Sequence, residues 1–513
     1  MNDIVFITPN NAVVTYQSLA GKYSAIEPPT WALLLAESMR SKGFSPAIID
    51  SLAEQISDDE VAKRIQEMTP KLVVFVVYGQ NVNAGTTNMS GAVRLAEHIK
   101  KNGITAPIGF VGSHVQALPL QTMEKEPSID FVCLNEGVYA LINALEANVR
   151  RIEDLESVPG FAIRLDGNII FTGPASIVPK DRMDIDMPGY AWDLLPYDKE
   201  PLDLYRAPYW HAEYQDEFRS PYAALQTSIG CQFKCSFCMI NLINKDDDAP
   251  TSISSNYSGM RYWSIEFVQR ELTKLVEMGV KTIRITDEMF LLNKKYYMPV
   301  LDVLAELNKN DDLKLWAYSR IDTVPNPEIL ARVRKAGIRW LCLGIESGDK
   351  KIRLEIAKGK FEDVDVRKVV AQVEEADINV MANYIYGLPG DTEETIEKTY
   401  DLSVELNTLG WNTYAAMALP GSPLYETAKQ KGEQVPEEYE EFSFHSFETK
   451  PLRTEFMEAH EILKMRDEKF TAYFSRQEFL DKIERKFGQA SVENIIEMNK
   501  KKLKRKIFAH FED

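Results

Sequence analysis

Cysteine is scarce in this chain, which has five among its 513 residues. Three of them, Cys231, Cys235 and Cys238, stand together in the run Thr-Ser-Ile-Gly-Cys-Gln-Phe-Lys-Cys-Ser-Phe-Cys. The other two, Cys133 and Cys342, each lie in an apolar run and are most simply buried strand residues. An odd number of cysteines, with no second close pair, argues against a disulfide framework and favours a reducing compartment.

The clustered cysteines are spaced i, i+4 and i+7, which places three thiolates on one short loop. A zinc site needs four ligands, and histidines such as His211 and His445 are remote from the loop in sequence. Iron–sulfur clusters are also held by cysteine thiolates, usually four. Three thiolates can hold three irons of a cubane and leave the fourth iron open to a small molecule. The spacing favours this cluster, and zinc is the alternative.

The sequence also lacks an export signal, a long apolar run and an excess of positive charge. Its first residues have neither a basic segment nor a long apolar one, and its longest apolar run, residues 72–78, is too short to span a bilayer. The net charge of -18 argues against nucleic acid as the main partner. We therefore expect a cytoplasmic protein that binds neither membranes nor nucleic acid. A basic run at residues 500–506 is most simply a solvated helix face, with contact to an anionic substrate or partner as the alternative.

The first 150 residues alternate between strand and helix patterns. Apolar runs rich in Val and Ile predict strands at residues 3–8, 47–50, 72–77, 108–111 and 131–134. Helical patterns fall between them, for example after the Pro pair at 28–29 and over residues 90–101. This alternation predicts an α/β domain, with a parallel sheet covered on both faces.

Polar and flexible loops follow the predicted strands. Because ligands of such sheets bind beyond the carboxyl ends of the strands, these loops together indicate a binding site. Each loop alone is equally typical of an ordinary turn. The residues concerned are Asn10, then Tyr78, Gly79, Gln80 and Asn81, then Gly112, Ser113 and His114, and finally Asn135, Glu136 and Gly137.

A second alternating pattern begins after a hairpin at residues 161–172 and a linker that reaches about residue 220. Six further βα units predict a partial (β/α)6 barrel, whose chemistry belongs at the carboxyl ends of its strands. Cys231 follows the first of these strands, as that rule requires. The expected domains are residues 1–150, a hairpin and linker at 151–220, the barrel at 221–430, and a small, mostly helical domain at 431–513. The expected barrel strands are residues 223–226, 282–285, 314–317, 340–343, 379–386 and 412–418.

The cysteine loop, with Phe237 before the last cysteine, resembles that of the radical S-adenosylmethionine (SAM) enzymes. Over residues 1–430 the chain resembles their cobalamin-binding subgroup, in which a Rossmann-like domain precedes the partial barrel. It lacks the Asp-x-His-x-x-Gly motif that supplies a lower cobalt ligand in some cobalamin domains, and His114 is not in that context. Ile229 also stands directly before Gly-Cys, a position at which Arg is frequent in the family. The supporting motifs lie at residues 112–119, 135–137, 285–290, 320–322, 344–348, 386–392 and 420–425.

The resemblance implies three cofactors: a [4Fe-4S] cluster, SAM and cobalamin. It implies that Cys231, Cys235 and Cys238 hold the cluster. It places the SAM site at Phe237, Asp287, Glu288, Arg320, Glu346, Ser347, Gly387 and Pro389. It places the cobalamin site at Asn10, Tyr78, Gly79, Gln80, Asn81, Gly112, Ser113, His114, Glu136 and Gly137.

On this pattern Asp287 or Glu288 binds the SAM ammonium through a charge-assisted hydrogen bond. Arg320 pairs with the SAM carboxylate, or alternatively forms a structural ion pair with Asp322. The carboxylate of Glu346 and the hydroxyl beside it, at position 347, bond the ribose.

Glycines at 387–390 let the backbone approach the adenine closely. Alternatively these residues form a strand-to-helix turn capped by Asp391 or Thr392, and both roles can hold at once.

The resemblance implies a radical methyltransferase that uses a 5′-deoxyadenosyl radical to methylate an unactivated carbon, or a phosphinate phosphorus, of a small molecule. An electron donor such as flavodoxin or ferredoxin would reduce the cluster. Some subgroup members use the same cofactors for cyclisation, oxidation or rearrangement without methyl transfer, and a non-enzymatic iron–sulfur sensor is a further alternative. No residue is singled out as catalytic, and the substrate cannot be read from the sequence.

Overall fold

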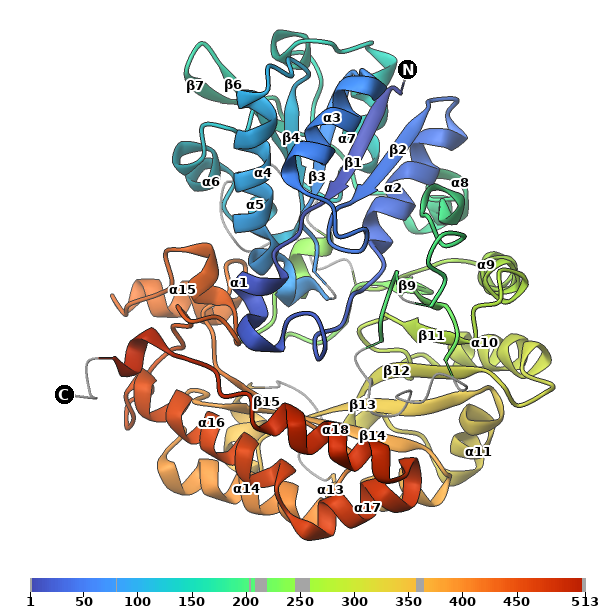
Figure 1. Cartoon of the computed structure of the whole chain (residues 1–513), viewed down its shortest axis with the longest axis vertical. Coiled ribbons are helices and arrows are strands. Elements are labelled where there is room, and N and C mark those ends of the chain that lie inside the picture. The colour runs from blue at the N-terminus through green and yellow to red at the C-terminus, as the bar shows by residue number, and fades with distance from the viewer. Residues whose placement is uncertain are drawn as a thin grey trace.

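The structure is a computed structural model that describes residues 2–79, 81–202, 204–207, 219–244, 259–356 and 364–509. It contains two α/β units, each built on its own sheet (Figure 1). The N-terminal unit lies above the second in the view of Figure 1, and the chain crosses from one to the other after β7.

The N-terminal sheet has seven strands in the order β2-β1-β3-β4-β5-β6-β7. The first five in sequence are parallel, which confirms the Rossmann-like prediction, and the predicted hairpin joins the edge of the same sheet in antiparallel orientation. Every residue of β3 is buried, as expected for a central strand covered on both faces. The strands are β1 Ile4–Thr8, β2 Pro46–Asp50, β3 Leu72–Val76, β4 Ile108–Val111, β5 Phe131–Cys133, β6 Phe161–Leu165 and β7 Asn168–Phe171.

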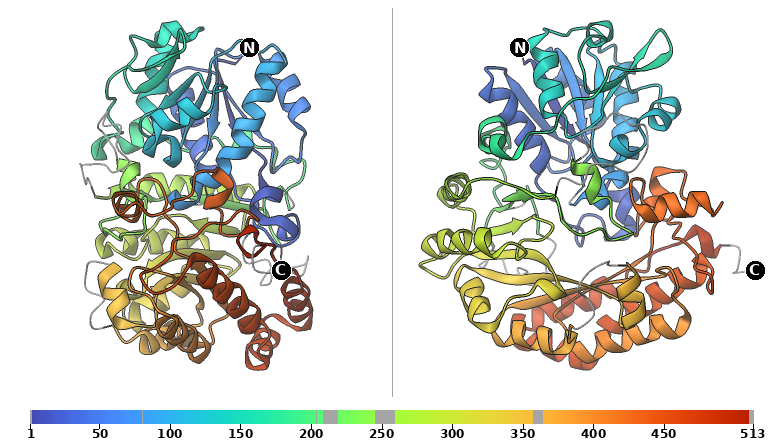
Figure 2. Two further views of the ribbon diagram at one scale, coloured as in Figure 1. Left: turned by 90° about the vertical axis from the view of Figure 1, so that its left-hand side faces the viewer. Right: turned by 180° about the vertical axis from the view of Figure 1, so that it is seen from behind.

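Helices cover both faces of this sheet (Figures 1 and 2). Two small elements, α1 Ala12–Tyr16 and the 3-10 helix η2 Val82–Asn88, follow the carboxyl ends of β1 and β3. The longer helices are α2 Thr30–Ser41, α3 Asp58–Met68, α4 Met89–Lys101 and α7 Val138–Glu146, with short helices α5 Ser113–Ala117 and α6 Pro119–Lys125.

The second sheet has six strands in the order β15-β14-β13-β12-β11-β8, all of them parallel. This is the partial barrel that the sequence predicts. Its strands are β8 Tyr222–Leu225, β11 Thr282–Ile285, β12 Lys314–Arg320, β13 Ile338–Glu346, β14 Asn379–Tyr386 and β15 Gly410–Ala415. Its helices are α9 Ile265–Glu277, α10 Lys294–Leu307, α11 Pro327–Lys335, α12 Lys350–Ile356, α13 Val366–Glu375 and α14 Glu393–Leu406.

The helical C-terminal region packs on the side of the six-stranded sheet that faces away from the N-terminal unit (Figure 1). Trp411 of β15 stacks on Tyr473 of the tail with ring centroids 5.0 Å apart, and Trp340 of β13 stacks on Phe487 at 6.0 Å. The tail therefore shares the core of the barrel. Its helices are α16 Ala459–Phe474, α17 Gln477–Phe487 and α18 Gln489–Asn499, and α15 Pro423–Gln430 precedes them. Across the described ranges, every helix is too short or too polar to cross a membrane.

The C-terminal region also reaches back to the start of the chain. The Ser443 hydroxyl donates to the Thr15 carbonyl at 3.1 Å, and the Gln17 amide donates to the Lys504 carbonyl at 3.0 Å. These contacts join segments that lie 428 and 487 residues apart. They hold the two units together on the side opposite the linker.

Candidate active site between the two sheets

The cysteine loop begins at the carboxyl end of β8, as the sequence predicts. A two-stranded antiparallel ribbon, β9 Ser228–Ile229 with β10 Arg261–Tyr262, holds its start. Gly230 then turns the chain with a φ of +98°, a conformation that glycine adopts without strain. The loop continues through Cys231, Cys235 and Cys238 to the 3-10 helix η7 Ile240–Asn244.

Cys231 is buried, Cys235 and Cys238 are half-buried, and the three thiols lie near one another. Burial raises the pKa of Cys231 to about 12 and that of Cys235 to about 11, and it raises that of Cys238 as well. The neighbouring cysteines raise the pKa of Cys231 and Cys238 further. Thiols in such surroundings ionise when a cationic metal binds them, because metal binding releases the thiol protons.

The spacing of these thiols bears on which metal group they fit. Within the described part of the chain, no three His, Cys, Asp or Glu residues converge on a point where one metal ion could sit. Sulfur ligands of a single zinc ion lie within about 4 Å of each other. Thiolates that bind separate irons of a cubane lie further apart. The donor set here, three thiols from one loop, is the set that a cubane with one open iron requires.

Asp287 fastens the cysteine loop to the barrel. Its carboxylate accepts hydrogen bonds from the Thr227 backbone N–H at 2.6 Å, the Thr227 hydroxyl at 2.7 Å and the Ser228 hydroxyl at 2.5 Å. Glu288, the other candidate for the SAM ammonium, has its pKa raised to about 7 by burial, and it accepts a hydrogen bond from the backbone of Val82. Both carboxylates thus bond within the protein, Asp287 to the Thr227 backbone and to two hydroxyls, and Glu288 to the Val82 backbone.

Arg320 at the end of β12 forms the ion pair with Asp322 that the sequence offered as an alternative, with an Nε to Oδ1 distance of 2.6 Å. Its guanidinium lies 3.5 Å from the ring centroid of Phe233 in the cysteine loop. It also lowers the pKa of Cys235 against the larger opposing effects of burial and of Glu346. Arg320 therefore contributes positive charge beside the cluster loop while remaining paired with Asp322.

Glu346 ends β13 in a left-handed conformation, with a φ of +65°. Its carboxylate folds back over Gly344, where a Cβ atom would lie only 2.5 Å from Oε1. Burial raises its pKa to about 7, and the charge of Arg320 opposes that shift. The β-bulge at this point and the missing side chain at 344 let the carboxylate reach the Arg320 side of the site.

The remaining SAM candidates lie along β14 and its neighbours. Ser347 is fully buried, and its hydroxyl contacts the Thr399 hydroxyl at 3.2 Å. Gly387 has a φ of +79°, and a Cβ atom there would lie 2.9 Å from Ile462 of α16. Pro389 belongs to the turn that Asp391 stabilises, the turn that the sequence offered as an alternative role. Phe237 packs against Leu388, Leu424 and their neighbours.

The loops of the N-terminal sheet gather at its carboxyl edge. Tyr78 stacks on Trp31 with centroids 4.6 Å apart, and its hydroxyl accepts from the Gln116 amide. Gly79 lines the same space, the Asn10 side chain accepts from the Ala12 backbone N–H at 3.3 Å, and Asn81 caps η2. Gln80 lies outside the described residues.

The loop after β4 is covered by other parts of the chain. Gly112 lies so near the Val77 carbonyl that a Cβ atom would be 2.7 Å from it, and the Ser113 hydroxyl donates to the Val82 carbonyl at 2.9 Å. His114 contacts the Thr86 hydroxyl at 3.1 Å and packs edge-on against Tyr439. Burial lowers the pKa of His114 to about 3, which keeps its ring neutral.

The loop after β5 is joined to the cysteine loop. Glu136 forms an ion pair with Arg261 of β10 at 2.7 Å, and both side chains are only 1% exposed. Glu136 also accepts from the Val178 backbone at 2.6 Å, and Gly137 follows it with a φ of +83°. The pair ties the N-terminal sheet to the ribbon that holds the cysteines.

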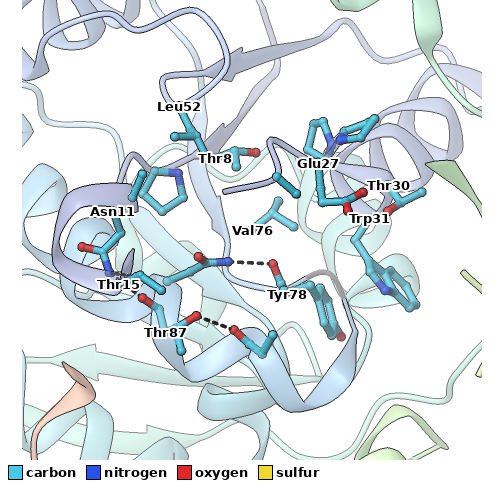
Figure 3. A pocket seen from close by; sticks show the side chains of 18 of the residues that line it. Thr8, Asn11, Thr15, Glu27, Thr30, Trp31, Leu52, Val76, Tyr78 and Thr87 are labelled. Atoms are coloured by element: carbon cyan, nitrogen blue, oxygen red, sulfur yellow. Dashed lines mark hydrogen bonds between the residues drawn. The ribbon is translucent and has the colours of Figure 1, made fainter. Parts of the chain in front are cut away.

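A pocket with an empty volume of about 880 Å³, part of it open to solvent, lies where the two sheets meet (Figure 3). Figure 3 shows Tyr78 and Trp31 on one side of it and Asn11 and Thr15 on the other. Thr8 and Val76 at the ends of β1 and β3 line it together with Ala224 of β8 and Thr286 beyond β11. The carboxyl ends of strands from both sheets therefore face one space.

Two family models match the chain in the order of the two units. The model of the B12 binding domain matches residues 16–145, and that of the radical SAM superfamily matches residues 225–403. The chain belongs to the cobalamin-binding radical SAM enzymes. Its cofactors are a [4Fe-4S] cluster, SAM and cobalamin.

Relatives of this enzyme carry different activities in their names. It is 27% identical over 403 residues to an uncharacterized methyltransferase of Pyrococcus horikoshii, covering 78% of each chain. It is 24% identical over 471 residues to the anaerobic magnesium-protoporphyrin IX monomethyl ester cyclase of Cereibacter sphaeroides, covering 90% of this chain and 68% of the cyclase.

Solved structures confirm the fold of the enzyme. The radical SAM methyltransferase TsrM from Kitasatospora setae superposes with a TM-score of 0.60 at 17% identity, covering 84% of this chain and 77% of TsrM. The cobalamin-dependent SAM radical enzyme OxsB superposes with a TM-score of 0.60 at 13% identity, covering 97% and 78%. Both share the arrangement of a cobalamin domain with a radical SAM barrel.

Sequence reasoning missed two residues that the structure places at the cysteine loop. Arg261 stands in an otherwise ordinary Arg-Tyr-Trp run, and nothing near it in sequence indicates its buried partner. Asn83 lies in η2 of the cobalamin domain, yet its side chain contacts Cys238 and Met239. The polar Asn-Val-Asn-Ala-Gly run around it is the only sequence signal, and it is typical of loops in general.

Proposed function

We propose that the enzyme is a SAM- and cobalamin-dependent radical methyltransferase that methylates an unactivated carbon, or a phosphinate phosphorus, of a small molecule. The observation that carries this proposal is the pocket at the meeting of the two sheets, lined from both the cobalamin domain and the barrel. A substrate there is within reach of both halves. Two of its relatives, the Pyrococcus protein and TsrM, are named methyltransferases.

The residues of the chain have separate parts in this proposal. Cys231, Cys235 and Cys238 hold the cluster and leave a coordination position for SAM. Glu288 binds the SAM ammonium, and Glu346 bonds the ribose hydroxyls. When bound, the cluster and SAM supply a 5′-deoxyadenosyl radical, and cobalamin supplies a methyl group that a carbon radical can accept.

Other residues of the site shape its surroundings. Trp31 and Tyr78 present stacked aromatic rings to the pocket and give that side of it an apolar surface. The pair of Arg320 with Asp322 holds the guanidinium near the cluster loop, where it offsets negative charge. A flavodoxin or ferredoxin is the proposed electron donor, and a cytoplasmic location belongs to the same proposal.

Cyclisation without methyl transfer is the second candidate function. It is favoured by the cyclase of Cereibacter sphaeroides, whose alignment covers 90% of this chain. The cofactors are common to both reactions, so the fate of the SAM methyl group separates them.

The deciding experiment uses reconstituted enzyme, a reductant, candidate substrates and SAM labelled in its methyl group. Methyl transfer predicts a labelled product, with one S-adenosylhomocysteine and one 5′-deoxyadenosine formed per turnover. An unlabelled product, formed with 5′-deoxyadenosine but without stoichiometric S-adenosylhomocysteine, would establish the cyclase or oxidase alternative and leave the cofactors unchanged.

Neighbouring carboxylates at 287 and 288 provide a matched test of the SAM site. Asp287→Asn replaces one carboxylate oxygen by an NH₂ group and removes the negative charge that strengthens three hydrogen bonds, and we expect it to lower the free energy of unfolding by about 3 kcal/mol. Glu288→Gln removes a charge from the proposed ammonium contact, and we expect a roughly tenfold or greater loss of SAM affinity with little change in stability.

Urea unfolding measures the first effect, and SAM binding to the reconstituted protein measures the second. The opposite pattern, in which Asp287→Asn weakens SAM binding without loss of stability and Glu288→Gln leaves binding intact, would transfer the ammonium contact to Asp287.

A further inference from the structure

The 3-10 helix η2 of the cobalamin domain lies between the loop after β4 and the cysteine loop. On one side, its Val82 carbonyl accepts from Ser113, and its Thr86 hydroxyl contacts His114. On the other side, Asn83 reaches Cys238 and Met239 of the cysteine loop. One short segment thus touches both the candidate cobalamin loops and the candidate cluster ligands.

The Asn83 side chain makes two contacts of opposite polarity with the cysteine loop. Its Oδ1 accepts a hydrogen bond from the Met239 backbone N–H at 2.9 Å. Its Nδ2 lies 3.7 Å from Cys238 Sγ, within hydrogen-bond distance for sulfur. The first contact fixes the orientation of the amide, because an N–H facing another N–H would be repelled, and it thereby directs the NH₂ group at the sulfur.

Asn83 is itself held in place by its own segment. Its backbone N–H donates to Asn81 Oδ1 at 3.0 Å, and Ala84 continues the turn through a bond to the Asn81 carbonyl. An amide that is anchored at its backbone and fixed at its oxygen loses little entropy when its nitrogen contacts the sulfur.

A hydrogen bond to a cluster ligand changes the cluster in a predictable direction. Reduction adds negative charge to the cluster and its thiolates, and an N–H directed at a ligand sulfur stabilises that charge. Partners of the ligands also orient them and are part of the site. The thiol that Asn83 contacts is that of Cys238, a half-buried residue.

We infer that Asn83, a residue of the cobalamin domain, is a positioning residue of the iron–sulfur site: it orients the third cysteine ligand and raises the reduction potential of the cluster. The cluster needs the cobalamin domain for its full properties, whichever reaction the enzyme carries out. This role requires the cluster but not methyl transfer.

The test compares Asn83→Ala and Asn83→Asp in the full reconstituted enzyme. Asn83→Ala removes both contacts, and Asn83→Asp keeps the acceptor for Met239 but loses the donor to Cys238. The matched control is Asn102→Ala, because Asn102 is an exposed residue whose side chain bonds to its own helix end, at the His98 carbonyl. The readouts are the midpoint potential of the cluster, followed by electron paramagnetic resonance, and hydrogen exchange of the Met239 amide in cluster-free protein.

Both Asn83 variants should show a more negative midpoint potential than the control. Met239 exchange should be roughly fivefold faster in Asn83→Ala, as expected for the loss of one hydrogen bond, and near that of the unmodified protein in Asn83→Asp. If Asn83→Ala fails to fold, Asn83→Ser takes its place. Serine also lacks the amide group that makes both contacts, but it keeps a polar hydroxyl at this position. Potentials equal to that of the control in the folded variants would overturn the inference.

Discussion

Replacing Cys231, Cys235 and Cys238 together by Ala is expected to abolish iron uptake. The unmodified chain should take up about four irons under anaerobic reconstitution and show the broad visible absorption of a [4Fe-4S] cluster. The triple variant has no thiolate left on the loop, so its iron content should fall to background and SAM cleavage should stop. Iron analysis and the yield of 5′-deoxyadenosine measure the two effects.

The matched control is Cys133→Ala with Cys342→Ala. Both of these cysteines are buried in strands of the two sheets, at β5 and β13, and neither belongs to the loop. This double variant should keep its iron while losing some stability through the small cavities left behind. Full iron content in the triple variant would show that the cluster has other ligands.

Breaking the buried ion pair between Arg261 and Glu136 is expected to have the largest effect on stability. Arg261→Met leaves a carboxylate that is 1% exposed without its counter-ion, and removing one partner of such a pair costs about 3–5 kcal/mol. Arg261 also donates a hydrogen bond to the Val178 carbonyl at 2.8 Å, and the variant removes this bond. The midpoint of urea unfolding should fall sharply, and the reconstituted variant should lose iron faster, because β10 supports the cysteine loop.

Two comparisons define this result. Arg332→Met breaks an ion pair with Asp302 whose side chains are 44% and 66% exposed, and such pairs contribute less than about 1 kcal/mol. The double variant Arg261→Met with Glu136→Met replaces both charges by apolar groups and should recover much of the lost stability. Equal effects of Arg261→Met and Arg332→Met would contradict the importance assigned to the buried pair.

The strands of both sheets could be predicted from the sequence because they are short apolar runs between polar turns. Their ends at the active site could not. β12 continues through Arg320, and β13 continues to Glu346, beyond the predicted ends at 317 and 343. Backbone pairing with the neighbouring strand extends both strands into charged residues. A hydrophobic pattern stops before those residues and therefore predicts an earlier end. The domain boundaries at 150, 220 and 430 stay predictions.

The position of the cysteine loop could also be predicted, because its spacing is local. The contacts around it are not local. Asp287 and Glu288 look equivalent in sequence, and only the folded chain brings Thr227 and Ser228 to the first of them. Asn83 lies 155 residues before its sulfur partner, and no pattern of charge or periodicity connects two such positions.

The contacts between the two ends of the chain have a consequence for its synthesis. Gln17 bonds to the Lys504 carbonyl, 487 residues later. A ribosome that adds about 5–20 residues per second needs roughly half a minute to a minute and a half to cover that distance. During this interval the N-terminal sheet can fold, but the surface formed by α1 lacks its final partner. A chaperone that holds nascent chains therefore has a defined surface to protect, and a pause in translation near the end of the message would prolong its exposure.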